Sequence, residues 1–291
     1  MILPPALVVL STVLLAATPA GATPPPAQVV PVAKLAPGER RPVAILLHGL
    51  GGSGAEMLAD PELRSWAAQA RVFLVAPDGT MDRQGRRFWN AGGACCNFDG
   101  RPVDDLSRLE TLIDHWRQRP DVDPTRVYLI GFSNGGFMAH RLACWMDDRL
   151  AAVVSLAGAG RAREEACGVK TSLAVAEVHG DADPVVRFEG GRVFDSPELD
   201  PHPSSPDTIR DWAARLQCPV QAAPRATKVD LDPRLAGPET TIESHRCPRG
   251  VAELWTVHGG DHHLFTPALV TRIGAFLTAH PKQPPKLPKR K

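Results

Sequence analysis

Short apolar runs that end in turn residues alternate along this chain with longer segments in which apolar residues recur at helical spacing. The first pattern is typical of buried strands and the second of amphipathic helices. The predicted strands are VAILLHG, VFLVAPDG, RVYLIG, AAVVSLAG, LAVAEVHG and AELWTVHG, which begin at residues 43, 72, 126, 151, 173 and 252. The predicted helices span residues 56–70, 104–119, 134–146, 205–216 and 266–280. This alternation predicts one α/β domain with a mostly parallel central sheet and helices on both faces.

Residues 82–102 show no clear period and are rich in Gly, Arg and Asn. They predict a long loop of the kind that shapes binding sites. Within it, Trp89 and Asn90 either line a pocket or anchor the loop by packing. Asp104 and Asp105 open the next helix, where an acidic side chain is expected to cap backbone N–H groups.

A serine stands where the strand that begins at Arg126 meets the helix that follows it. Gly131, Ser133 and Gly135 form G-x-S-x-G at this point, which is the sequence context of a nucleophile elbow. A sharp turn of this type exposes the hydroxyl, and glycines avoid clashes with the crossing backbone. An ordinary Gly-rich turn is the alternative, so the presence of catalytic partners decides between the two.

A serine hydroxyl needs a base within hydrogen-bond reach, and the base needs a carboxylate to orient it. In an α/β-hydrolase the acid and then the histidine follow the serine along the chain. VHGDADPVV ends one predicted strand with Asp181 and Asp183, and VHGGDHHLF ends the last strand with His262 and His263. We favour Asp183, because Pro184 holds it in a turn away from the strand, and we expect Asp181 to close the strand.

The turn LLHGLGGSG ends the first predicted strand, the place from which this fold contributes one backbone N–H to an oxyanion hole. The donors would be the N–H groups of Leu50 and Asn134, with His48 supporting the turn. No G-x-x-x-x-G-K-[ST] follows, so a phosphate-binding loop is not indicated. His179 and His258 precede glycines at strand ends, and we expect both to be structural.

The chain resembles secreted α/β-hydrolases related to poly(3-hydroxybutyrate) depolymerases and to feruloyl and acetylxylan esterases. The resemblance is carried by LLHGLGGSG, VAPDGT, FWNAGGACC, VDDLSRLETLID, DPTRVYLIGFSNGGFMAHRLAC, VHGDADPVVRFEGG and VHGGDHHLF. It implies the α/β-hydrolase fold and a catalytic set of Ser133, Asp183 and His262. Relatives usually follow this histidine with Trp-Pro, whereas HHLFTP stands here. One wall of the pocket is therefore expected to differ, and His263 becomes a candidate pocket residue.

The resemblance extends to the cysteines. It implies the disulfides Cys144–Cys167 and Cys218–Cys247, and it leaves Cys95 next to Cys96. That adjacent pair either forms a strained vicinal disulfide, stays as two thiols or pairs differently. An even count of six Cys favours disulfides over metal sites in an exported protein.

The two ends of the chain differ from its body in composition. Residues 1–22 have the apolar stretch and small-residue ending of a signal peptide, and the stretch is too short to span a bilayer. Residues 23–40 form a Pro-rich leader and residues 281–291 a basic Pro-rich tail, neither of which is expected to fold. The tail holds five positive charges, so the remaining chain has a net charge of −4. That balance argues against a nucleic-acid partner.

The sequence thus predicts an exported serine ester hydrolase with a catalytic domain over residues 41–280 and no cofactor or metal. The expected substrate is a polyhydroxyalkanoate, a feruloyl or acetyl ester, or a small soluble ester. The alternative is a non-catalytic secreted binding protein that keeps the hydrolase fold.

Overall fold

The computed structural model describes residues 26–30, 35–160, 167–219 and 223–282 of the 291-residue chain. The predicted signal peptide and residues 283–291 of the tail lie outside these ranges. Within the described ranges, no helix combines the length and the apolar character that crossing a membrane requires.

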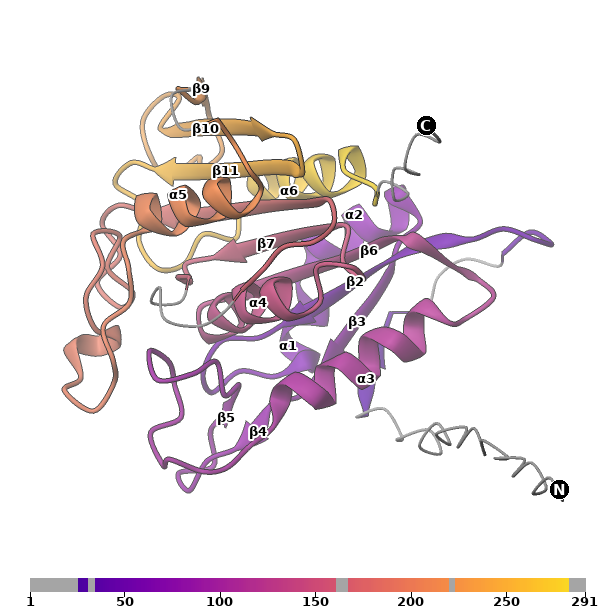
Figure 1. Ribbon diagram of the computed structural model, residues 1–291, viewed down its shortest axis with the longest axis horizontal. Helices are drawn as coiled ribbons and strands as arrows, with labels where there is room; N and C mark the ends of the chain where they lie inside the picture. Colours follow the sequence, from indigo (N-terminus) through magenta and orange to yellow (C-terminus); the bar gives the residue numbers. More distant parts are fainter. Residues whose placement is uncertain (1–25, 31–34, 161–166, 220–222, 283–291) are drawn as a thin grey trace, which may run out of the picture.

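A nine-stranded sheet forms the centre of the molecule, in the order β1-β3-β2-β6-β7-β8-β11-β10-β9 (Figure 1). The six strands from β3 to β11 in this order run parallel, while β1, β10 and β9 extend the two edges by antiparallel pairing. The bounds are β1 Ala27–Val29, β2 Arg41–Leu47, β3 Phe73–Pro77, β6 Val122–Phe132, β7 Ala152–Leu156, β8 Leu173–Gly180, β9 Arg225–Val229, β10 Thr240–Cys247 and β11 Gly250–Val257. A separate short hairpin pairs β4 (Thr80–Met81) with β5 (Arg87–Phe88).

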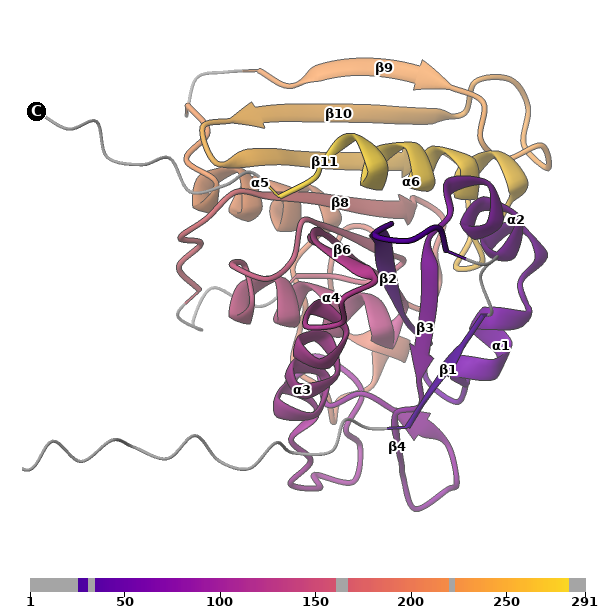
Figure 2. The ribbon, with the colours of Figure 1, turned by 90° about the vertical axis from the view of Figure 1, so that its right-hand side faces the viewer.

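Helices cover both faces of the sheet, with α1, α2 and α6 on one face and α3, α4 and α5 on the other (Figure 2). Their bounds are α1 Gly54–Ala59, α2 Pro61–Ala70, α3 Asp105–Arg117, α4 Asn134–Trp145, α5 Ser205–Arg215 and α6 Pro267–Ala279. A 3₁₀ turn, η1, spans Val193–Asp195. The predicted fold class, with a mostly parallel sheet between two helical layers, is confirmed.

Strand β2 shows why the central strands are apolar at every position. Val43, Ile45 and Leu47 pack into the core beneath α3, α4 and α5, and Ala44 and Leu46 pack into the core beneath α1, α2 and α6. A strand buried on both faces has no side that tolerates polar residues. The carboxyl ends of these parallel strands all lie at one end of the sheet, and the candidate residues lie there.

Several elements differ from the sequence prediction. The helix predicted over 56–70 is two helices, because Asp60 caps the second through its side chain and Pro61 occupies the first helical position. Residues 27–29 of the leader form β1, although no fold was expected there. Strand β9 was missed because it is an edge strand with mostly exposed side chains, and β10, which lies between β9 and β11, was missed because it is largely polar and lacks a continuous apolar run.

The first residues of the tail are also fixed to the body, although no fold was expected for the tail. Lys282 donates from Nζ to the carbonyl oxygens of Ser172 at 2.7 Å and Leu150 at 3.0 Å, and to Thr171 Oγ1 at 2.7 Å. Burial lowers the pKa of Lys282 to about 8. This anchor lies where β7 and β8 begin, at the sheet end opposite the carboxyl ends of the strands.

Candidate active site

Ser133 lies in a tight turn between β6 and α4, with φ at +53°. A Cβ on Gly131 would lie 2.0 Å from the carbonyl oxygen of Gly135, and a Cβ on Gly135 would lie 2.1 Å from that of Leu47. No side chain fits either gap, so both glycines are steric requirements of the turn. A non-glycine residue at positive φ is strained, and such strain concentrates at functional sites.

Three side chains from distant parts of the chain meet at this turn. His262 Nε2 lies 2.9 Å from Ser133 Oγ, and His262 Nδ1 lies 2.7 Å from Asp183 Oδ2. The other carboxylate oxygen of Asp183 accepts the backbone N–H groups of Val185 and Val186. Ser133 and His262 are each 8% exposed, so the pair is reachable from solvent while largely shielded from it.

The structure also places Asp181 and His263, the alternatives to Asp183 and His262, outside this hydrogen-bonded set. Asp181 accepts hydrogen bonds from the Gly259 N–H and pairs with His258, so it closes the end of the strand. His263 is exposed, and its ring lies 6.1 Å from that of Phe132. Neither Asp181 nor His263 contacts Ser133 through a hydrogen bond among the described residues.

The turn after β2 is held by a histidine whose protonation follows from its partners. The Gly79 N–H donates to His48 Nε2 at 2.9 Å, so the proton of the neutral ring is on Nδ1, which donates to the Gly49 carbonyl at 2.7 Å. Burial lowers the pKa of His48, which favours this neutral form. The Gly49 carbonyl and the Leu50 N–H belong to one peptide unit, so His48 fixes the orientation of the predicted oxyanion donor.

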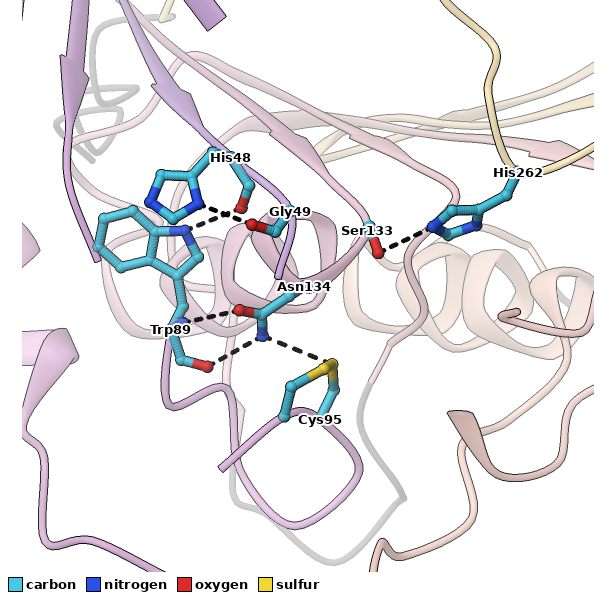
Figure 3. The surroundings of a disulfide bond; sticks show 8 residues. His48, Gly49, Trp89, Cys95, Ser133, Asn134 and His262 are labelled. Carbon is cyan, nitrogen blue, oxygen red and sulfur yellow. Dashed lines mark hydrogen bonds between the residues drawn. A yellow bond between two sulfur atoms is a disulfide. The ribbon is translucent and has the colours of Figure 1, made fainter. Parts of the chain in front are cut away.

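Asn134 contributes more than its backbone N–H (Figure 3). Its side-chain amide exchanges two hydrogen bonds with the backbone of Trp89, accepting from N at 2.7 Å and donating to O at 2.9 Å. The amide also donates to Cys95 Sγ at 3.5 Å. The indole of Trp89 in turn donates to the His48 carbonyl at 3.0 Å. Asn134 therefore ties the long loop and its disulfide to the elbow, a role that the sequence analysis missed.

The two loop residues predicted as pocket or anchor serve as anchors in the structure. Trp89 is fully buried. Asn90 donates from its side chain to the Val103 carbonyl, and its backbone N–H donates to the buried carboxylate of Asp105 at 2.7 Å. Burial raises the pKa of Asp105, which is opposed by the Asn90 N–H and the Arg108 guanidinium. Asp104 caps α3 through the Ser107 N–H, as expected.

A cavity of about 260 Å³ opens beside the turn after β2. Its walls are mainly apolar, with the carboxylates of Glu56 and Asp60 as the acidic groups. The remaining lining residues come from the turn after β2, from α1 and α2, from the end of β6 and from the loop after β11: His48, Gly49, Leu50, Gly52, Ser53, Met57, Leu63, Phe132 and Phe265. Trp89, Asn90 and His263 do not line this cavity.

This geometry agrees with comparisons to known proteins. A family model described as phospholipase/carboxylesterase matches residues 32–196, which is more than half of the chain. The chain belongs to the phospholipase/carboxylesterase family. The matched region contains Ser133 and Asp183 and ends before His262.

The chain is also similar to two curated esterases over most of its length. The putative esterase NocK of Nocardia uniformis subsp. tsuyamanensis is 30% identical over 77% of this chain and 65% of its own length. Feruloyl esterase B of Piromyces equi is 26% identical over 76% of this chain and 39% of its own length. The chain thus spans less than two thirds of the length of either relative. The predicted resemblance to α/β-hydrolase esterases is confirmed.

Solved structures share the fold of this member of the phospholipase/carboxylesterase family. An acetyl xylan esterase from Aspergillus awamori superposes with a TM-score of 0.59 at 13% identity, over 86% of this chain and 93% of that one. A carboxylesterase from Bacillus cereus gives 0.52 at 16% identity, over 82% and 88%. At such identities the likeness concerns the fold.

All six cysteines are paired in the structure, as Cys95–Cys96, Cys144–Cys167 and Cys218–Cys247. The two pairs implied by the resemblance are present, and the adjacent cysteines form the vicinal disulfide. Over the described ranges, no group of three or more His, Cys, Asp or Glu side chains is arranged to hold a metal ion.

Proposed function

We propose that this protein is a serine ester hydrolase that works through an acyl-enzyme. The observation that carries this proposal is the hydrogen-bonded series Ser133–His262–Asp183 at a strained elbow next to an oriented backbone turn. Its nucleophile, base and orienting carboxylate have the mutual distances that such catalysis needs.

Each side chain has one task in this mechanism. His262 Nε2 takes the proton of Ser133 as Oγ attacks the ester carbonyl carbon, and Asp183 holds the Nδ1–H of the resulting imidazolium. The N–H groups of Leu50 and Asn134 receive the negative charge that develops on the carbonyl oxygen. The alcohol leaves with the proton from His262, and a water activated by the same ring releases the acid.

The cavity beside Leu50 is proposed to receive the apolar part of the ester. A volume of about 260 Å³ with Met57, Leu63 and Phe265 in its wall suits one aromatic ring or a short acyl chain. Feruloyl esters, acetyl esters and short hydroxyalkanoate units all fall within that class. The names of the relatives, which include feruloyl esterases, support the first of these.

Labelling with a fluorophosphonate tests the chemistry apart from the substrate. We expect stoichiometric labelling of the wild-type protein at Ser133 and none of Ser133→Ala, which should keep its fold because little packing is lost. Wild-type protein that resists labelling would support the non-catalytic alternative. Rates on methyl ferulate, hydroxybutyrate oligomers and p-nitrophenyl acetate then identify the ester class, with Ser133→Ala expected to lose about 10⁴-fold or more in kcat.

We also propose that the protein is exported. The signal-like residues 1–22 and the three disulfides support export, since disulfides persist in oxidising compartments. Thiol counting on denatured, unreduced protein isolated from its source tests this. A count near zero is expected, and six free thiols would contradict the proposal.

A further inference from the structure

Asp183 lies between two histidines, of which the mechanism uses one. Its Oδ2 is 2.7 Å from His262 Nδ1 and 3.2 Å from His179 Nε2. His179 and Glu177 are alternate residues of β8, so both side chains project from the same face, and both are fully buried. His179 was expected to be structural because it precedes a glycine at the end of a strand.

The charge of His179 follows from the atoms that face its ring. Nε2 faces the Val186 carbonyl at 2.7 Å and the Asp183 carboxylate, and both are acceptors. Nδ1 faces Glu177 Oε1 at 3.0 Å and Ser205 Oγ at 2.8 Å. An unprotonated Nε2 would point its lone pair at an oxygen lone pair. An unprotonated Nδ1 could accept from the Ser205 hydroxyl, but it would still face the lone pairs of the Glu177 carboxylate at 3.0 Å. Both nitrogens therefore carry protons, and the ring is an imidazolium.

Glu177 is the counter-ion that this cation requires in the interior. Its second oxygen lies 2.7 Å from His140 Nε2. The indole of Trp212, which can only donate, gives its N–H to His140 Nδ1 at 2.9 Å. The His140 proton is consequently on Nε2 and is donated to Glu177. Hydrogen bonds on both oxygens keep the carboxylate ionised without solvent.

The remaining groups packed around His179 do not compete for this role. The Phe188 ring meets it edge-on at 6.0 Å. His202, on the loop before α5, is buried, which lowers its pKa and favours the neutral form. Burial alone would lower the pKa of His179, but its hydrogen bonds to Asp183 and Glu177 raise it to about 9. The pKa of Asp183 is held well below its usual range against burial by His179 and His262.

We propose that His179 is a positioning residue, charged at neutral pH and held by Glu177, that fixes Asp183 and offsets part of its negative charge toward His262. The fixing is geometric, because His179 holds the Val186 carbonyl while the Val186 N–H holds Asp183 Oδ1. The role in catalysis rests on the proposed function, whereas the charge of the ring does not.

The electrostatic consequence has a definite sign. A cation beside Asp183 weakens the attraction of that carboxylate for a proton on His262. Removing the cation strengthens the attraction, so His262 stays protonated to higher pH and is less available as a base. The acid limb of the kcat/KM profile then moves to higher pH, by about one unit if the change is typical of a lost neighbouring charge.

The test compares three variants by pH–rate profile. His179→Gln is expected to move the acid limb upward by about one unit, which lowers the rate by up to about tenfold below that limb, with KM little changed. Glu177→Gln removes the counter-ion that keeps His179 protonated, so His179 becomes neutral and the acid limb is expected to move in the same direction by a smaller amount. Ser205→Ala is the matched control, since it removes a hydroxyl from the same ring nitrogen without changing charge, and its acid limb should stay in place. Equal profiles for wild type and both charge variants would overturn the positioning role.

A second measurement does not depend on the variants folding or on activity. Nitrogen-15 NMR of histidine-labelled wild-type protein is expected to show His179 with both ring nitrogens protonated from about pH 6 to about pH 8. An ordinary histidine, with a pKa of about 6.5, loses one of these protons within that range. A neutral ring across that range would overturn the proposal even in an active enzyme. If the wild-type protein carries a charged His179 but fluorophosphonate does not label Ser133, only the proposed function is contradicted, and the charge of His179 stands.

Discussion

Ser133 has two flanks that are built from different chemistry. On the oxyanion flank, the groups that hydrogen-bond to His48, Trp89 and Asn134 are neutral: backbone amides, the Asn134 amide and a His48 ring with one donor and one acceptor partner. The base flank is ionic, with Asp183 and Glu177 on either side of His179. Two buried histidines thus have opposite charge states because their partners differ.

The difference matches what each flank is proposed to do. Negative charge appears on the oxyanion flank only during reaction, and oriented dipoles stabilise it without a fixed countercharge. A proton moves on the base flank, so the fixed charges there set the affinity of His262 for that proton. Changes on the neutral flank should therefore alter the rate at every pH, whereas changes on the ionic flank should alter the pH dependence.

The largest expected effect lies on the ionic flank. His262→Ala removes the base that lies 2.9 Å from Ser133 Oγ and should lose at least about 10³-fold in kcat. His263→Ala is the matched control, because the ring of His263 lies beside Phe132 and does not reach Ser133. This variant should affect KM or stability more than kcat. Steady-state kinetics decide between them. An inactive His263→Ala beside an active His262→Ala would move the catalytic histidine by one position.

A smaller effect is expected on the neutral flank. His48→Ala frees the peptide unit that carries the Leu50 N–H and should lower kcat by about 10²-fold, comparable to losing one oxyanion donor. The midpoint of the acid limb should stay unchanged, because burial lowers the pKa of His48 and favours its neutral form. A displaced acid limb in this variant would show that His48 belongs with the ionic flank.

The sequence could predict features that follow from local patterns, but not the contacts that depend on the folded arrangement. The elbow follows from the local pattern G-x-S-x-G after an apolar strand, and the fold follows from the alternation of strands and helices. Asp183 and His262 were selected by chain order and by resemblance. The charge of His179 could not be predicted, because the sequence does not show which atoms of Glu177, Val186 and Ser205 face its ring, although the first two lie within seven residues of it. The clamp from Asn134 to Trp89 likewise joins residues 45 positions apart.

The smallest expected effect is on stability, and it distinguishes the two flanks without any substrate. His179 has a pKa of about 9 in the folded protein against 6.5 as an ordinary histidine. A raised pKa means that the folded state binds the additional proton. This contribution is fully present below about pH 6.5 and is lost as the pH rises through about 9. Between these limits, the loss of this contribution should lower the free energy of unfolding by at most about 1.4 kcal/mol for each unit of rising pH.

Other groups titrate in this range, so the comparison must be made by difference. Lys282, whose folded pKa is about 8, acts in the opposite direction at higher pH, which limits the useful window to about pH 6.5 to 8. Urea unfolding of wild type and His179→Gln across that window should give a less steep decline for the variant. His202→Gln is the control, because a lowered pKa keeps the buried ring neutral in the folded state, and the unfolded ring, with an ordinary pKa of about 6.5, is mostly neutral over the upper part of the window, so the slope changes little there. Equal slopes for wild type and His179→Gln would mean that His179 is neutral like His48, and the contrast between the two flanks would disappear.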